Sequence, residues 1–319
     1  MNHSTFKSFT FGIGLFFTLP LVYGNSSSPS SSDGTLYINK SKTHKVAPVK
    51  YGFHYEEIGM MGEGALHAEL IRNRSFEEAT PPAGLSVKNG LYENVPAPRV
   101  KEKKVFQADP LIGWTTYPLS YTPVFISRTD ENPMSGENKY SMLVNVTEDI
   151  ANHPDALILN RGYYGMNLKT DTSYRLSLFL KNRNYSAPLR VFLVDEWGQR
   201  VSNVIEVNVG NRDWTKYTGE LKPEKNVRRG MFAIQPMSKG QFQIDVVSLF
   251  PSDTWNDGKS VFRKDIVQNL KEFSPSFIRF PGGCIVHGVN EETMYHWKKT
   301  LGPIENRPGQ WSKWAPYYL

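Results

Sequence analysis

This sequence has very little cysteine and no long apolar run. One cysteine, Cys284, occurs among 319 residues, so no internal disulfide can form. The main N-terminal apolar stretch, from about residue 9 to residue 21, is too short to span a bilayer comfortably. No cysteine lies near the end of that stretch, which argues against a lipid-anchored lipoprotein. The sequence also lacks Cys/His metal spacing, a P-loop and a dinucleotide fingerprint, so no recognisable metal or nucleotide motif is present.

Positive charge is not concentrated in one place. The formal net charge is +6, yet Lys and Arg are scattered, and the densest runs, residues 101–104 and 225–229, are interrupted. We interpret these runs as solvated loops and do not expect nucleic-acid binding. The hydrophobic fraction of 39% suffices for packed cores in a chain long enough for two domains. The aromatic fraction of 13% is high, and sugar sites commonly use flat apolar side chains with a polar edge.

The N-terminus is typical of an exported protein. Lys7 precedes the short apolar stretch, and residues 22–24 resemble a small-residue cleavage site. These features predict a signal peptide over residues 1–24 and a secreted, extracytoplasmic protein without a stable membrane anchor. A retained anchor is the alternative. Residues 25–34, rich in Ser and Pro, are expected to form a flexible tether.

The segment 277–284, Phe-Ile-Arg-Phe-Pro-Gly-Gly-Cys, is the most informative one. An arginine stands at the end of a short apolar run, directly before a Pro-Gly-Gly turn. Arginine is costly to bury without a partner, and glycines let backbone and ligand approach closely. Arg279 therefore marks a candidate site. The alternative is a structural ion pair at the end of a strand.

A helix is expected directly before this strand. Apolar residues at spacings of four, four and three predict a helix from Ser260 to Phe273, with Ser260 as a plausible N-cap residue and Ser274-Pro275 as the stop. Helix, strand and glycine turn form one step of an α/β repeat. Such repeats collect chemistry at the carboxyl ends of their strands.

Residues 48–58 have a similar pattern. A strand-like run ends in Glu56 and Glu57, and residues 65–76 beyond a glycine-rich turn are expected to be helical. Adjacent strand residues face opposite ways, so at most one of the two glutamates lines a pocket. The alternative is that both are surface charges or partners of Arg72 and Arg74.

The middle of the chain changes character. Alternating apolar stretches at residues 174–180, 189–194 and 242–249 are separated by Asn, Gly, Asp and Pro. This pattern predicts an antiparallel β-sandwich or jelly roll. Its aromatic residues either form a sugar-stacking surface or fill a core and an interdomain interface; they include Trp114, Tyr117, Tyr121 and the run 162–166.

Five motifs in register resemble glycoside hydrolase family 51, the α-L-arabinofuranosidases. They lie at residues 51–58, 68–77, 245–251, 279–284 and 301–309. The resemblance is to the long form of the family, and it implies an incomplete TIM (β/α)8 barrel interrupted by an inserted antiparallel β-sandwich that resembles a carbohydrate-binding module. The expected parts after residue 34 are an N-terminal strand with the first barrel strand and helix (35–90), the sandwich (91–250) and a truncated continuation of the barrel (251–319).

The resemblance also implies site residues. Glu56 matches a glutamate that binds arabinose hydroxyls, Arg279 matches the arginine of the Arg-Phe-Pro-Gly-Gly motif, and Cys284 matches a position at the substrate. One departure is His287, which stands where the family usually has glutamate. The family's acid/base and nucleophile glutamates lie on later strands, beyond Leu319. No catalytic residue is therefore expected in this chain, and neither Glu63 nor Glu292 is assigned such a role.

Barrel length supports the interpretation of the chain as an N-terminal fragment. Residues 51–90 and 252–319 together are far shorter than the roughly 250 residues that a barrel needs. The resemblance implies a retaining exo-hydrolase that releases terminal arabinofuranosyl groups from arabinose-containing polysaccharides or oligosaccharides such as arabinan and arabinoxylan. That chemistry needs no metal or organic cofactor, and the sequence gives no signal for an oligomeric state. The rival hypothesis is a secreted, non-catalytic carbohydrate-binding protein.

Overall fold

The computed structural model describes residues 38–41, 43, 45, 49, 51–58, 60–80, 86–93, 106–288, 291 and 293–310. The chain divides into two compact units, residues 1–48 and 49–319. The described residues of the first unit, all between 38 and 45, form neither helix nor strand. The predicted signal peptide and the Ser/Pro-rich segment lie outside the described residues. All elements below belong to the second unit.

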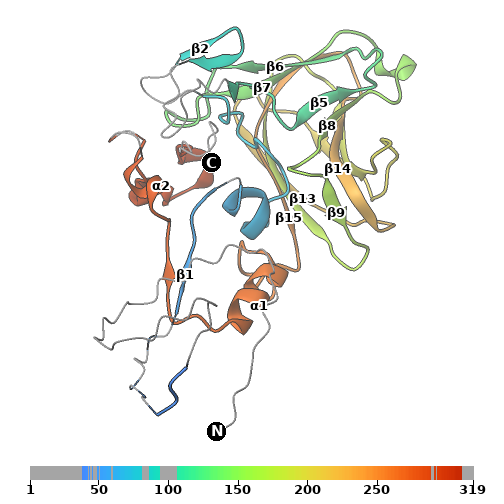
Figure 1. Ribbon diagram of the computed structural model, residues 1–319. Helices are drawn as coiled ribbons and strands as arrows, with labels where there is room; N and C mark the ends of the chain where they lie inside the picture. The colour runs from blue at the N-terminus through green and yellow to red at the C-terminus, as the bar shows by residue number, and fades with distance from the viewer. Residues whose placement is uncertain are drawn as a thin grey trace. The chain divides into compact units, whose positions relative to one another are not determined.

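Antiparallel sheets dominate the second unit, and helices are few (Figure 1). A five-stranded sheet has the order β13 (Thr215–Leu221), β10 (Tyr174–Asn182), β15 (Gly240–Pro251), β7 (Ser141–Val146) and β6 (Val124–Thr129). Another sheet has the order β12 (Ile205–Asn208), β11 (Pro188–Val194), β14 (Val227–Gln235), β8 (Leu157–Asn160) and β5 (Trp114–Tyr117), with β9 (Met166–Leu168) paired to β14. The predicted strands at residues 174–180, 189–194 and 242–249 are thus confirmed.

The two sheets pack face to face around one core. Leu176 and Leu178 of the five-stranded sheet belong to the same buried cluster as Phe232 and Ile234 of the other sheet. Strand alternation accounts for this cluster, because residues i and i+2 face the same side. The second sheet also buries apolar residues on its other face, among them Phe192.

Smaller elements flank the sheets. A three-stranded antiparallel sheet joins β2 (Ser86–Lys88), β3 (Leu91–Glu93) and β4 (Phe106–Gln107). One 3-10 turn, η2 (Ile150–Asn152), has Asp149 as its N-cap residue, and the Asp149 side chain accepts a hydrogen bond from the Ala151 N–H. Near the C-terminus lie α2 (Cys284–His287), η3 (Trp297–Thr300) and η4 (Ile304–Asn306). No helix within the described ranges is long and apolar enough to cross a membrane.

A short parallel ribbon carries the two motifs that the sequence singled out. β1 (Phe53–His54) pairs in parallel with β16 (Ile278–Arg279), and they lie side by side in Figure 1. The helix before β16 is confirmed as α1 (Lys264–Glu272), although it begins later than predicted. Its N-cap residue is Arg263 and not Ser260, because residues 254–260 form a turn in which the Gly258 N–H donates to the Thr254 carbonyl oxygen.

The helix predicted for residues 65–76 is not formed. A single π-helical turn, η1 (Gly62–Leu66), is followed by irregular, extended chain. The Ala68 N–H donates to the Val261 oxygen at 2.8 Å, and the Leu70 N–H donates to the Leu249 oxygen at 3.1 Å. Hydrogen bonds to distant segments therefore replace those of a helix, and tertiary packing overrides local propensity.

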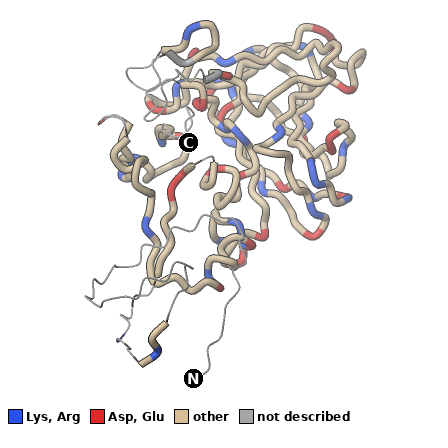
Figure 2. Tube along the Cα trace, in the orientation of Figure 1, with Lys and Arg blue, Asp and Glu red and all other residues tan. Residues whose placement is uncertain are grey.

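Charge on the described surface is mixed. Figure 2 shows Lys and Arg interspersed with Asp and Glu over the two sheets. In the basic run 225–229, Lys225, Arg228 and Arg229 are exposed, which agrees with its interpretation as a solvated segment. The other basic run, residues 101–104, lies outside the described residues.

Candidate active site

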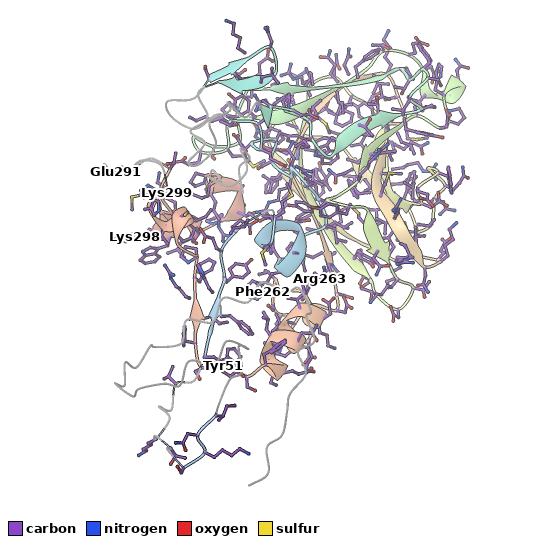
Figure 3. The ribbon with its side chains drawn as sticks, viewed as in Figure 1. Tyr51, Phe262, Arg263, Glu291, Lys298 and Lys299 are labelled. Atoms are coloured by element: carbon purple, nitrogen blue, oxygen red, sulfur yellow. The ribbon has the colours of Figure 1, made fainter. Side chains whose placement is uncertain are left out.

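The parallel register brings the two predicted site segments to one end of the ribbon. His54 lies opposite Arg279, and the Tyr55 N–H donates to the Arg279 carbonyl oxygen at 2.9 Å. Parallel strands have their carboxyl ends at the same edge, so Glu56 and Arg279 emerge together. Figure 3 places Tyr51 towards the other end of the ribbon, and Glu291, Lys298 and Lys299 beyond the carboxyl end.

Two glycines make room between these side chains. Gly282 has a φ of +130°, and a Cβ built there would lie 2.3 Å from Cγ of Glu56. Only glycine fits such an approach. A Cβ on Gly283 would lie 3.7 Å from Arg279 Nη2 and 3.8 Å from Glu56 Oε2, which is ordinary contact. An atom at that point therefore touches the guanidinium and the carboxylate together.

The Glu56 carboxylate is held in a fixed position. The Ile285 N–H, in the first turn of α2, donates to Oε1 at 3.1 Å. The imidazole Nε2 of His54 lies 3.6 Å from Oε2, and the Glu56 side chain is only 9% exposed. A fixed, partly shielded carboxylate can accept hydrogen bonds from ligand hydroxyls with little loss of side-chain entropy.

Glu57 faces the other way, as strand alternation predicts. Its Oε2 accepts a hydrogen bond from the Gly62 N–H, and its Oε1 is buried with no hydrogen-bond partner among the residues that the structure describes. Burial raises the pKa of the Glu57 carboxyl to about 7 despite the Gly62 hydrogen bond. Burial also raises the pKa of the neighbouring Tyr55 phenol, with the charges of Glu57 and Glu63 adding to the effect.

Glu63 has the opposite electrostatic environment. Burial alone would raise its pKa, but a hydrogen bond with His67, the charge of Arg74 and a hydrogen bond from Tyr163 together lower the pKa to about 2. His67 Nδ1 lies 3.3 Å from Glu63 Oε1, and Tyr163 Oη donates to Oε2 at 3.0 Å. Two neighbouring glutamates thus have widely separated pKa values.

The ion-pair alternatives from the sequence are not what the structure shows. Arg72 pairs with Glu78 at 2.7 Å, and Arg74 lies 3.8 Å from Glu69. Arg279 is exposed and makes no ion pair with any carboxylate in the described part of the chain.

Cys284 and His287 lie on the same short helix after the glycines. Cys284 begins α2 and is half-buried with a free thiol. His287 is exposed, and its Nδ1 lies 2.8 Å from the Gly288 carbonyl oxygen. No group of three or more potential metal ligands occurs among the residues that the structure describes.

His54 is the site residue that the sequence reasoning missed. The signal was present, because a count of two residues back from Glu56 places His54 on the same strand face. Glu56 drew attention through the resemblance, whereas a histidine inside a strand-like run carries no motif of its own.

Several aromatic residues considered for sugar stacking have structural contacts. Trp114 is 6% exposed, packs between the rings of Phe76 and Phe232, and donates from Nε1 to the Asn73 carbonyl oxygen. The Tyr163 ring lies against Gly64, where a Cβ would approach within 2.4 Å. These contacts favour the core and packing interpretation for both rings.

Comparison with known proteins shows that the chain is similar to α-L-arabinofuranosidases, and the predicted resemblance to family 51 is confirmed. The family model described as "Alpha-L-arabinofuranosidase 1 domain" matches residues 269–318. Alpha-L-arabinofuranosidase 1 of Arabidopsis thaliana is 28% identical over 83% of this chain and 36% of its own length. An extracellular exo-alpha-L-arabinofuranosidase of Streptomyces chartreusis is 26% identical over 83% of this chain and 29% of its own length.

A solved structure shows the same fold. The arabinose-bound MgGH51 α-L-arabinofuranosidase superposes with a TM-score of 0.69 and 24% identity, covering 88% of this chain and 41% of that one. The present chain is therefore mostly sheet with few helices and similar in fold to part of a family 51 arabinofuranosidase. It spans about a third of the length of the two curated relatives described above.

Proposed function

We propose that this chain carries the sugar-binding part of a retaining α-L-arabinofuranosidase. The pairing of β1 with β16 carries the proposal, because it brings Glu56 and Arg279 to one strand end with Gly282 and Gly283 between them. In this proposal Glu56 binds arabinose hydroxyls, Arg279 directs its guanidinium at the same sugar, and Cys284 contacts the substrate from α2.

The ribbon and α1 are proposed to be the first part of a (β/α)8 barrel into which the two-sheet unit is inserted. Parallel pairing across an intervening helix supports this architecture. Exposed apolar side chains on and beside the ribbon support it as well, since Phe277, Ile278 and Phe280 are each more than half exposed. Contiguous apolar exposure is typical of a surface that packs against further polypeptide.

The chemistry proposed for the longer protein uses two carboxyl groups about 5 to 5.5 Å apart, one as nucleophile and one as acid and then base. We place both in polypeptide that follows residue 319. Glu56, already held by Ile285, serves the binding of the sugar and not bond cleavage. This mechanism requires no metal or organic cofactor.

The proposed substrates are arabinose-containing polysaccharides and oligosaccharides outside the cell. The predicted signal peptide over residues 1–24 supports export, and the Streptomyces relative is named as extracellular. The rival function, a non-catalytic carbohydrate-binding protein, has less support because Trp114 and Tyr163 are occupied by packing contacts.

Hydrolysis of an aryl α-L-arabinofuranoside tests the proposal. The 319-residue chain should give no turnover above background, whereas a longer protein that continues into the proposed catalytic strands should be active. Turnover by the 319-residue chain that is lost with one specific glutamate would show that the catalytic carboxylates lie within it. Activity of the longer protein on other aryl glycosides alone would contradict the proposed substrate.

A further inference from the structure

His54 shares the strand face of the proposed sugar-binding residues. Residues i and i+2 of a strand face the same side, which places His54 with Glu56. In the parallel ribbon, His54 is also the direct register partner of Arg279. Imidazole, carboxylate and guanidinium therefore gather at one face of the ribbon.

The distances within this group are short. His54 Nε2 lies 3.6 Å from Glu56 Oε2, while Glu56 Oε1 is turned towards the Ile285 N–H at 3.1 Å. The same Oε2 lies beside the space at Gly283 that Arg279 Nη2 also borders. The carboxylate oxygen nearest that space is thus also the one nearest His54.

Exposure separates the roles of the two side chains. The His54 side chain is 47% exposed, whereas that of Glu56 is 9% exposed. A ligand that reaches the Glu56 carboxylate from solvent therefore meets the imidazole beside it. The imidazole is accessible enough to exchange water for a ligand hydroxyl.

The three groups have complementary hydrogen-bonding chemistry. A carboxylate only accepts, a guanidinium only donates, and a neutral imidazole offers one donor and one acceptor. Neighbouring hydroxyls of a furanose each donate and accept, so one can bind Glu56 and Arg279 while the next binds an imidazole nitrogen.

We infer that His54 is a further sugar-contacting residue of this site, which hydrogen-bonds a ring hydroxyl adjacent to the one held by Glu56 and selects sugars that carry that hydroxyl. This inference rests on the proposed function, because it takes the occupant to be a furanose. It assigns a specificity role to a residue that no recognised motif marks.

The test is an NMR titration of the 319-residue chain with methyl α-L-arabinofuranoside. Two resonances report separately: the His54 Cε1–H follows the imidazole, and the Ile285 amide follows the Glu56 carboxylate to which it donates. Both should shift with one shared Kd. The His153 ring should not shift, and it is a matched reference because its Nε2 lies 3.4 Å from a carboxylate oxygen of Glu148.

Variants then measure the contact. His54→Phe keeps a ring but removes both nitrogens. It should raise Kd by about 2- to 10-fold, the range for the loss of one neutral hydrogen bond. His54→Gln should recover part of that loss, because its amide donates and accepts. His153→Gln should leave Kd unchanged. The same Kd measurements are repeated with the 2-, 3- and 5-deoxy forms of the glycoside. For the form that lacks the contacted hydroxyl, wild type and His54→Phe should have equal Kd, because neither can make that hydrogen bond.

The outcomes separate the inference from the proposed function. A shift at Ile285 without one at His54, with Kd unchanged in His54→Phe, overturns the role of His54 and leaves the sugar pocket in place. No saturable shift at either resonance overturns both. If His54→Phe does not fold, the two wild-type resonances and the Kd of His54→Gln still decide.

Discussion

The phenol of Tyr163 donates a hydrogen bond to the carboxylate of Glu63 at 3.0 Å. Tyr163 lies between β8 and β9 of the two-sheet unit, and Glu63 lies in the turn that follows the Glu56 strand. A second hydrogen bond holds the start of this turn, since the Gly62 N–H donates to Glu57. The two sheets therefore support the strand end on which the candidate site is built.

Loss of this hydrogen bond should lower the stability of the fold. Tyr163→Phe leaves a partly buried carboxylate without one donor, and hydrogen bonds to charged groups are worth about 1.5 to 3 kcal/mol. Urea denaturation should show a free energy of unfolding reduced by about that amount. Tyr164→Phe is the matched control, because Tyr164 is 81% exposed and should have no effect. Equal stability of both variants would contradict a supporting role for the Tyr163 contact.

Glu57 should make stability depend on pH between about 4.5 and 7. Its pKa is raised from 4.5 to about 7, so over this window the folded state holds a proton that the unfolded state has lost. Stability therefore falls as pH rises through the window and then levels off. The shift corresponds to at most about 3.4 kcal/mol.

The comparison variant is Glu57→Gln, which cannot titrate. The difference in the free energy of unfolding between wild type and this variant should decrease from pH 4.5 to pH 7, in a series of urea titrations. Other buried carboxylates, such as Glu69, titrate in both proteins and cancel in the difference. A difference that is constant with pH would mean that Glu57 is ionised normally.

Gly282 should not tolerate a side chain. At its φ of +130° an L-residue is strained, and a Cβ would lie 2.3 Å from the Glu56 side chain. Gly282→Ala is expected to cost about 1 to 3 kcal/mol and to displace Glu56. Gly302→Ala tests positive φ without a clash, and Gly210→Ala has neither, since no atom lies within 4 Å of a Cβ at these two positions. The melting temperature should be highest for Gly210→Ala, lower for Gly302→Ala and lowest for Gly282→Ala.

Local patterns predicted the strands and the α1 helix, but not what residues 65–76 do. Period-two alternation in residues 174–180 marks the strand face that is buried. The helical period in residues 262–273 marks one apolar face of α1, although no residue of this helix is buried. In both cases the sequence alone indicates the element. Residues 65–76 have helix-forming composition, yet Glu69 is fully buried and accepts a hydrogen bond from the Leu249 N–H at 2.8 Å. That partner is 180 residues away, and no window of sequence contains it.

The candidate site could be predicted in part for a similar reason. Arg279 and Glu56 each end a strand-like run, and the motif resemblance joined them before any contact was known. Their proximity depends on parallel pairing across more than 200 residues, which periodicity does not encode. The roles of His54 and of the Ile285 N–H follow only from that pairing and from the turn at Gly282.

Under the proposed function, Arg279 and Glu56 should both be needed for efficient turnover in a longer protein that includes the proposed catalytic strands. Arg279 has a planar fork of donors, so Arg279→Lys is not conservative where those directions matter. We expect Arg279→Lys and Glu56→Gln each to lower kcat/KM by at least about tenfold, or roughly 1.4 kcal/mol, on an aryl α-L-arabinofuranoside. Cys284→Ser should cost less, since a thiol is only a weak hydrogen-bond partner and a hydroxyl nearly fits its space.

Thermal unfolding of the same variants distinguishes a sugar-binding role of Arg279 from a structural role. The exposed guanidinium of Arg279, with no ion pair to any described carboxylate, gives Arg279→Lys little reason to change Tm. A large kinetic loss at unchanged Tm therefore supports a role at the sugar. Near-normal kinetics with a lowered Tm would instead show that Arg279 stabilises the strand end. Sugar recognition at this site would then have to come from Glu56 and its neighbours on the β1 face.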